Sequence, residues 1–186
     1  MNSEKLPVIN TSRLSLRAIS AADLDDFYAI YSNPEVMRYW STPPLPNRDA
    51  ARELIENIVR DVERHEILKW GIALDGRLIG SVTLFHMELT HRRAEIGYAL
   101  GRAYWGNGYM GEALTAVINY AFDSLNLHRI EADVDPRNDA SVRTVQRLGF
   151  QREGYLRERW QVSGEIQDAF FFGLLRPDWE ALHRSL

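Results

Sequence analysis

The chain has 186 residues, of which 45% are hydrophobic and 26% are charged, as in a globular protein large enough for one substantial core. Its formal net charge is −4, with acidic and basic residues interspersed, which argues against a nucleic-acid partner. The absence of cysteine excludes disulfides, thiolate metal sites and a cysteine nucleophile, and the sequence has no apolar run long enough for a membrane span.

Hydrophobic periodicity and turn residues predict the elements in chain order. Alternation of apolar and polar residues predicts a strand over 13–19, and Ser20 is placed to cap a helix that follows it to about residue 32. Prolines in the segment 41–47 exclude helix there and predict a loop between two helices. The remaining predicted strands cover 68–74, 77–89, 93–100, 129–134, 150–162 and 165–174, and the remaining helices cover 49–65, 111–125, 139–148 and a short stretch from Pro177.

This order of elements predicts an α+β fold with a mixed, mostly antiparallel twisted sheet of about seven strands and helices on both faces. The turn sequence Asp75-Gly76 predicts an antiparallel hairpin, whereas the strand–helix–strand unit from Arg93 to Val134 must be a parallel, right-handed crossover. We expect a single domain over 1–186 with its core at 11–179. A cytoplasmic location is expected because the first residues lack the apolar stretch of a secretory signal.

A glycine-rich motif lies inside the crossover. Residues 104–112 read YWGNGYMGE, in which Gly106, Gly108 and Gly111 match G-x-G-x-x-G, the dinucleotide signature of a Rossmann fold. That interpretation is disfavoured because three consecutive strands precede the motif and too few residues follow it for a second half. The glycines still allow a tight turn that exposes N–H groups at a helix N-terminus. They predict a pyrophosphate site for NAD or coenzyme A, the alternative being a turn that only starts a helix.

Other short signals occur around the motif in a characteristic order. They are AEIGYAL (94–100), YWGNGYMGEAL (104–114), NDASVRTVQRLGF (138–150) and REG (152–154). Together they resemble the GNAT superfamily of acyl-coenzyme A N-acyltransferases, and most closely its Rim-type branch, which acetylates N-termini of ribosomal proteins. The resemblance extends over nearly the whole chain, from 11–19 to 168–179. It implies acetyl-coenzyme A (acetyl-CoA) as co-substrate and direct acetyl transfer to a primary amine, either a protein N-terminal α-amine or a small-molecule amine, without a metal.

The resemblance also implies which residues contact the coenzyme. Backbone amides of the glycine loop would hold the pyrophosphate, the strand before the loop would pair with the pantetheine arm, and Asn138 would reach the arm from the opposite side. Many members have a tyrosine general acid where this chain has Val145. The implied coenzyme-binding residues are Tyr98, Ala99, Leu100, Gly106, Asn107, Gly108, Tyr109, Met110, Gly111 and Asn138.

Acyl transfer from a thioester requires a neutral amine, a donor for the oxyanion, and a proton or charge stabilisation for the leaving thiolate. Glu95 is the candidate general base and matches the base glutamate of some relatives. Strand alternation places it on one face with Gly97 and Ala99, two small residues that leave room for a ligand. The alternative is a surface carboxylate paired with Arg92 or Arg93.

Ser141 is the candidate general acid, because it lies in the first turn of the predicted helix after Asn138 and the Rim-type resemblance implies a serine donor to sulfur there. Its alternative role is to cap that helix. A backbone N–H near Ala99 or Leu100 is the expected oxyanion donor. Glu153 is a second base candidate, for which a structural role is favoured.

Two other functions stay open at this point. One is a non-catalytic acyl-CoA-binding module, which would have the same glycine loop and which the absence of the tyrosine acid allows. The other is an NAD-dependent oxidoreductase, which the order of elements disfavours. Asp168 is expected to be a structural anchor, and His86 an ordinary sheet histidine. The expected partners are the amine acceptor and, through a sheet edge at the terminal hairpin, a second copy of the chain.

Overall fold

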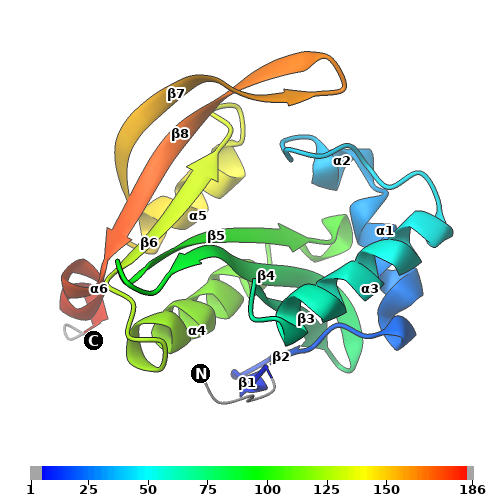
Figure 1. Cartoon of the computed structure of the whole chain (residues 1–186), viewed down its shortest axis with the longest axis horizontal. Coiled ribbons are helices and arrows are strands. Elements are labelled where there is room, and N and C mark those ends of the chain that lie inside the picture. Colours follow the sequence, from blue (N-terminus) through cyan, green and yellow to red (C-terminus); the bar gives the residue numbers. More distant parts are fainter. Residues whose placement is uncertain (1–5, 184–186) are drawn as a thin grey trace.

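The computed structural model describes residues 6–183, so 1–5 and 184–186, the ends of the predicted domain, lie outside the described residues (Figure 1). The strands are β1 (Ile9–Asn10), β2 (Ser15–Arg17), β3 (Leu68–Leu74), β4 (Arg77–Glu88), β5 (Arg93–Leu100), β6 (Arg129–Val134), β7 (Gln151–Val162) and β8 (Glu165–Leu175). The helices are α1 (Leu24–Tyr31), α2 (Pro34–Met37), α3 (Arg48–Glu63), α4 (Tyr109–Asp123), α5 (Asp139–Arg147) and α6 (Arg176–His183), with short 3-10 turns at Ala21–Asp23 and Arg102–Tyr104. Within 6–183, no helix is both long and apolar enough to cross a bilayer.

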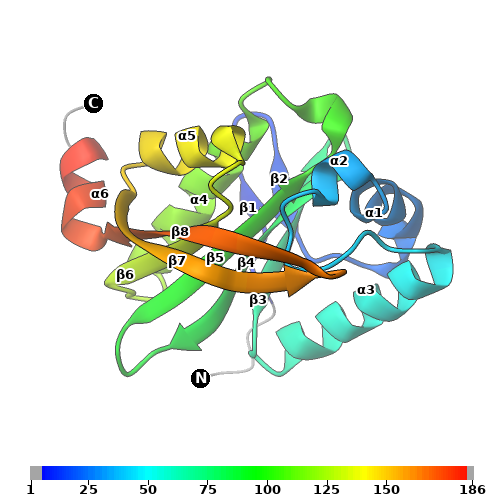
Figure 2. The same cartoon turned by 90° about the horizontal axis from the view of Figure 1, so that it is seen from above.

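The eight strands found within residues 6–183 form one sheet in the order β1-β2-β3-β4-β5-β6-β8-β7. Among these strands the β5–β6 pair alone is parallel, which excludes a doubly wound Rossmann sheet. Helices cover both faces, so the predicted α+β class is confirmed (Figure 2). One core packs α4, α5 and α6 on the sheet around Trp70 and Phe122, and the other packs α1, α2 and α3 around Phe27 and Ile55.

Several boundaries differ from the sequence-based expectation. The strand expected over 13–19 is reduced to β2, and its start is delayed because Thr11 N donates to Leu14 O at 2.9 Å across a turn. β1 and α2 are not among the predicted elements, and β1 accounts for the eighth strand. α4 begins at Tyr109, two residues before the expected start, so Gly111 lies inside the helix.

The parallel β5–β6 pair separates soon after it begins. Pairing is limited to the first three residues of each strand, after which the strands diverge (Figure 1). β5 still pairs with β4 on its other side, and Gly101 N donates to Ile79 O at 2.8 Å. Because hydrogen bonding alternates along an antiparallel pair, the backbone groups of Tyr98 and Leu100 point away from β4, toward the side that β6 has left. This stretch of β5 is therefore an open edge inside the sheet.

Candidate active site

The glycine loop leads from the end of β5 into α4. Gly106 and Gly108 have φ angles of 79° and 78°, in the left-handed region that favours glycine. The first bond of the helix runs from Glu112 N to Gly108 O at 3.1 Å, so the three preceding N–H groups have no acceptor inside the helix. A Cβ built on Gly106 or Gly111 would meet no atom within 4 Å, so the space beside them is open. The loop therefore fits an anionic group such as a pyrophosphate.

Trp105 and Asn107 hold the loop against the end of β5. The indole N–H of Trp105 donates to Leu100 O at 2.7 Å. Asn107 Nδ2 donates to the carbonyl oxygens of Tyr104 and Trp105 at 3.2 and 3.0 Å. The carbonyl of Leu100 thus already has a partner, whereas its N–H faces the open edge. The side chain of Asn107 shapes the loop.

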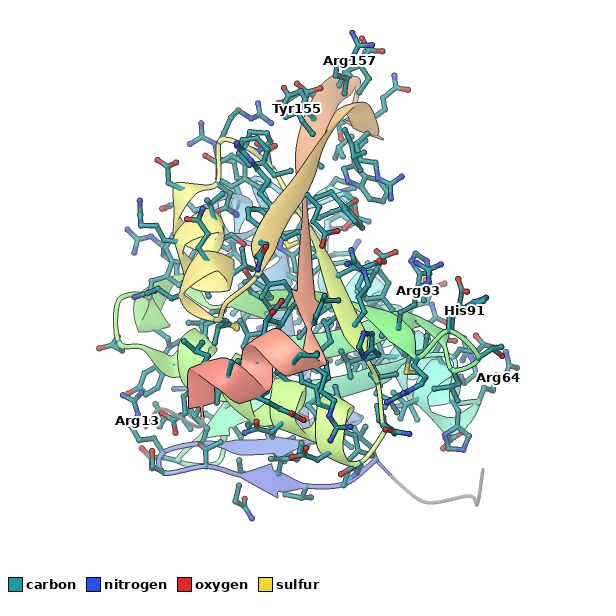
Figure 3. All side chains as sticks on the ribbon, turned by 90° about the vertical axis from the view of Figure 1, so that its left-hand side faces the viewer. Arg13, Arg64, His91, Arg93, Tyr155 and Arg157 are labelled. Atoms are coloured by element: carbon teal, nitrogen blue, oxygen red, sulfur yellow. The ribbon has the colours of Figure 1, made fainter. Side chains whose placement is uncertain are left out.

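Glu112, in the first turn of α4, fastens the N-terminal segment 11–13 to the loop. Its carboxylate accepts from Thr11 Oγ1 at 2.6 Å and from N and Nε of Arg13 at 2.9 and 2.6 Å. Burial alone would raise the pKa of Glu112, but the hydrogen bonds from this segment lower it to about 2. Arg13, at the edge of the molecule in Figure 3, also donates to Asn107 O at 2.9 Å. No local pattern in the sequence indicates the contact between Arg13 and Glu112, because the two residues are 99 positions apart.

The hydroxyl groups of Tyr98 and Ser141 meet where β5 and α5 approach each other, with 2.5 Å between their oxygens. Ser141 N donates to Asn138 Oδ1 at 3.1 Å, so Asn138 caps α5 and the capping role considered for Ser141 is wrong. Burial raises the pKa of Tyr98 to about 12, although the bond to Ser141 opposes the shift. The phenol is therefore protonated at neutral pH.

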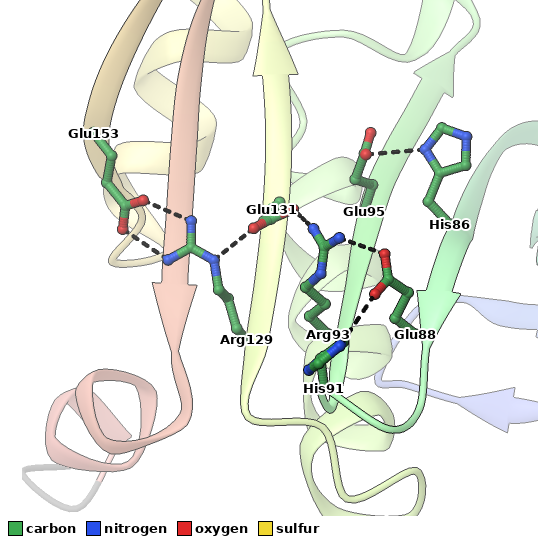
Figure 4. A network of polar contacts seen from close by, with 8 residues as sticks. All are labelled: His86, Glu88, His91, Arg93, Glu95, Arg129, Glu131 and Glu153. Carbon is green, nitrogen blue, oxygen red and sulfur yellow. Dashed lines mark hydrogen bonds and ion pairs between the residues drawn. The ribbon is translucent and has the colours of Figure 1, made fainter.

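Glu95 pairs with His86 of β4 rather than with an arginine (Figure 4). Glu95 Oε1 lies 2.9 Å from His86 Nδ1, and the two side chains are 18% and 69% exposed. Arg92 and Arg93, the partners in the alternative interpretation, form their bonds elsewhere. The candidate base is thus linked to a solvent-exposed imidazole.

The face of β5 that carries Glu95 has less free space than the sequence predicts. The ring of Phe85 lies 3.3 Å from the position that a Cβ on Gly97 would take. Ala99 is only 4% exposed and belongs to the core beneath α1 and α3. The expectation of open room beside both small residues is wrong, and the opening is instead along the backbone edge of β5.

Comparison with known proteins then decides the family. The family described as "Acetyltransferase (GNAT) domain" matches residues 13–151. The chain belongs to this family. It is accordingly an N-acetyltransferase: the predicted transfer of an acetyl group to an amine is confirmed, and the non-catalytic module is not favoured.

Three proteins illustrate how far the similarity of this GNAT enzyme extends. An uncharacterized N-acetyltransferase, p20, of Bacillus licheniformis is 35% identical over 176 residues, which are 94% of this chain and 99% of the relative. The putative ribosomal N-acetyltransferase YdaF of Bacillus subtilis is 31% identical over 138 residues, 72% of this chain and 75% of the relative. The solved structure of a spermidine N-acetyltransferase from Vibrio cholerae, in complex with CoA and spermine, matches with a TM-score of 0.80 at 28% identity and covers 91% of this chain and 99% of that one.

In this GNAT enzyme, ion pairs occupy the junction where β5 and β6 are still joined (Figure 4). Glu131 accepts from Arg93 Nη1 at 3.0 Å and from Arg129 Nε at 2.6 Å. Arg129 also donates to both carboxylate oxygens of Glu153, at 2.9 and 2.6 Å. These bonds hold the pKa of Glu153 below its ordinary value. Glu153 is therefore engaged in a structural contact, which makes it a poor base.

The predicted site residues of the GNAT enzyme fall into two groups. Tyr98, Leu100, Ser141 and the loop lie along the open edge of β5, beyond the point where β5 and β6 diverge. Glu95 is the last residue of β5 that pairs with β6, about 16 Å from Leu100 along the strand. Asp168 accepts from the Tyr155 hydroxyl and from a backbone N–H of the terminal hairpin, so it is the anchor that the sequence predicts. Among residues 6–183 no group of three or more acidic or histidine side chains is placed to hold a metal ion.

Proposed function

We propose that this enzyme holds acetyl-CoA between the glycine loop and the open edge of β5. The free amides at the start of α4 bind the pyrophosphate, and the carbonyl of Tyr98 and the N–H of Leu100 pair with the pantetheine arm. Asn138 has Nδ2 available for the arm, since its Oδ1 accepts from Ser141 N. The observation that carries the proposal is this continuity of an unpaired strand edge with a loop that ends in a helix N-terminus.

The transfer forms a nitrogen–carbon bond and breaks a carbon–sulfur bond, while the amine loses a proton and the sulfur gains one. The N–H of Tyr98, next to Ala99, is oriented to donate to the thioester oxygen, since Ala99 directs its own N–H to β4 and the N–H of Leu100 pairs with the arm. Ser141, at the N-terminus of α5, donates to the leaving sulfur. Glu95 accepts the amine proton through water, because it lies about 13 Å from Ala99 along the strand.

The acceptor that we favour is a protein N-terminal α-amine. Its pKa of about 7.7–8.0 leaves it partly neutral at neutral pH, so a distant, water-linked base suffices, whereas a lysine-like amine near 10.4 needs a stronger one. The carboxylates of β5 and β6 each have a basic partner: His86 for Glu95, two arginines for Glu131 and Arg159 for Asp133. A polycation would have to displace these partners.

A small polyamine is the second candidate, favoured by the structural match to the spermidine N-acetyltransferase. An acceptor panel separates the two: one peptide with a free N-terminus, the same peptide with a blocked N-terminus and an internal lysine, and spermidine. Release of the coenzyme thiol is measured, and the absence of cysteine from the chain removes any background signal. We expect the free N-terminus to react fastest; faster turnover of spermidine would overturn the assignment to N-termini.

We infer in addition that two copies of the enzyme associate through β7. This strand is the outer edge of the sheet, and Trp160 and Ile166 on the hairpin are 37% and 56% exposed. Light scattering after size exclusion tests the inference: the native enzyme is expected to be a dimer and Ile166→Lys a monomer. A monomeric native enzyme would contradict it. The cytoplasmic location stays a prediction.

A further inference from the structure

The contact between Tyr98 and Ser141 is not required to hold either element in place. The N-terminus of α5 is already capped by Asn138, and β5 is held along its length by β4. Yet the two hydroxyl oxygens are 2.5 Å apart, one from β5 and the other from α5, the helix that follows β6. Val145, on the same helix as Ser141, is 1% exposed and offers no proton donor, whereas the Ser141 hydroxyl does.

We propose that Tyr98 is a positioning residue, whose hydroxyl orients Ser141 so that the serine hydrogen points to the leaving sulfur of the coenzyme. This inference rests on the proposed function. A serine hydroxyl has one hydrogen and two lone pairs. When Tyr98 donates to Ser141 Oγ, the serine hydrogen must find another acceptor, and the developing thiolate at the helix N-terminus is one.

The Tyr98 and Ser141 hydroxyl groups both keep their hydrogen at neutral pH, so either can donate in this pair. We assign the donor role to Tyr98, because a phenol O–H is more acidic than an alcohol O–H and is therefore the stronger donor. No ionised group competes nearby on the same elements. On α5, Asp139 and Arg143 are exposed; on β5, Glu95 is bonded to His86, and Arg93 to two carboxylates.

No oxidant or additional reactant is needed. As the carbon–sulfur bond breaks, the sulfur keeps the electron pair and accepts a hydrogen bond from Ser141 Oγ–H. The proton that the amine has given up then completes the thiol. Tyr98 touches neither reacting atom and acts through Ser141 alone, so its removal should change the chemical step and leave coenzyme binding in place.

The test measures the thiol pKa of enzyme-bound coenzyme A from thiolate absorbance. The chain contains no cysteine, so the signal comes from the coenzyme only. We expect the bound thiol to have a lower pKa than free coenzyme A. Ser141→Ala and Tyr98→Phe should each raise it, and the double variant should match Ser141→Ala, because the two residues act in series.

Tyr31→Phe is the matched control. Tyr31 forms the same kind of hydroxyl pair, with Ser81 Oγ at 2.6 Å, but in the core beneath α1. The Tyr31→Phe variant should lose stability as Tyr98→Phe does, and it should leave the pKa of the bound coenzyme thiol unchanged. In steady-state kinetics, Tyr98→Phe should lower kcat about tenfold, which corresponds to the loss of one hydrogen bond in the transition state. The KM for acetyl-CoA should stay the same.

The outcomes separate this inference from the proposed function. If the native enzyme fails to bind coenzyme A, the proposed function is wrong. If it binds and Tyr98→Phe matches the native enzyme in thiol pKa and kcat, only the role of Tyr98 is wrong. Should Tyr98→Phe not fold, Ser141→Ala still decides, because an unchanged thiol pKa in that variant overturns the inference.

Discussion

Glu112 is the side chain that connects the N-terminal segment 11–13 to the glycine loop. It accepts hydrogen bonds from all three residues of segment 11–13, and Arg13 in turn bonds to Asn107 O within the loop. Hydrogen bonds to a charged group are worth roughly 1.5–3 kcal/mol each. The conformation of the loop therefore depends on the ionised carboxylate of Glu112.

We predict that Glu112→Gln lowers the free energy of unfolding by roughly 1.5–3 kcal/mol and weakens coenzyme A binding about tenfold. Urea unfolding and titration calorimetry measure the two effects. Asp23→Asn is the matched control: Asp23 binds Arg17 at 2.9 and 2.7 Å, outside the loop. It should lose stability and keep its coenzyme affinity. Equal weakening of binding in both variants would show that the loop has no special link to Glu112.

The same carboxylate gives a pH dependence whose sign is fixed. The pKa of Glu112 is about 2 in the folded chain against an ordinary value of 4.5, so its stabilising effect is complete above 4.5 and is lost as the pH falls toward 2. We predict that the stability difference between the native enzyme and Glu112→Gln is constant from neutral pH to about 4.5 and shrinks below that. Urea unfolding at stepped pH follows it. A difference that widens on acidification contradicts the assignment.

The role of Glu95 as general base is tested by Glu95→Gln, which keeps the shape of the side chain and removes its charge. If Glu95 accepts the amine proton through water, Glu95→Gln should lower kcat by roughly a hundredfold and leave KM for acetyl-CoA unchanged. His86→Asn should have a smaller effect, because asparagine tolerates the φ of 47° at this position and only the orienting contact is lost. Steady-state kinetics decide. A kcat unaffected by Glu95→Gln would leave water as the base.

At the scale of elements, the junction of β5 and β6 sets where the strands part. Glu131, 6% exposed, joins Arg93 of one strand to Arg129 of the other. We predict that Glu131→Gln lowers the free energy of unfolding by about 3 kcal/mol, since it leaves two arginines facing each other without the shared carboxylate. Glu153→Gln, at a side chain 40% exposed, should lower it by about 1 kcal/mol or less. Urea unfolding compares them, and equal losses would contradict a special role for the junction.

The order and type of the main elements were predictable because each carries its own periodicity. The stripe of apolar residues in α4 and the Asp75-Gly76 turn between β3 and β4 are local signals, and both are found in the structure. The residue at which α4 begins is not set by a local signal of this kind. It depends on the contact between Glu112 and Arg13, which lies 99 positions earlier in the chain. β1 and α2, with two and four residues, are too short to show any period.

The candidate site was predictable in its backbone and less so in its side chains. The loop follows from the glycines. The strand–helix–strand order predicts a parallel neighbour for β5, and the pairing of β5 with the coenzyme was implied by the family resemblance alone. The bond between Tyr98 and Ser141 requires the distance between β5 and α5, which no sequence spacing contains. The space beside Gly97 is likewise filled by Phe85, a residue of the neighbouring strand. Side-chain contacts between elements that are distant in the sequence therefore account for the errors at the site.

At the scale of the whole molecule, the proposed coenzyme site lies where β5 and β6 have separated. These two strands pair only through their first residues. A ligand that contacts the β5 edge, the start of α4 and α5 adds bonds across this divergence and binds the folded state alone. Such a ligand at about a hundred times its Kd stabilises the fold by about 2.7 kcal/mol. In a chain of this size that is a rise in Tm of about 5–10 °C.

We predict this rise for coenzyme A and none for NAD, measured by calorimetric unfolding at saturating ligand. Gly108→Ala, which strains a φ of 78° in the loop, should reduce the rise. Gly76→Ala imposes the same strain at a φ of 83° in the turn between β3 and β4, and it should lower the unliganded Tm while keeping the full rise. A rise with NAD, or one that survives in Gly108→Ala and fails in Gly76→Ala, would place the coenzyme elsewhere in the fold.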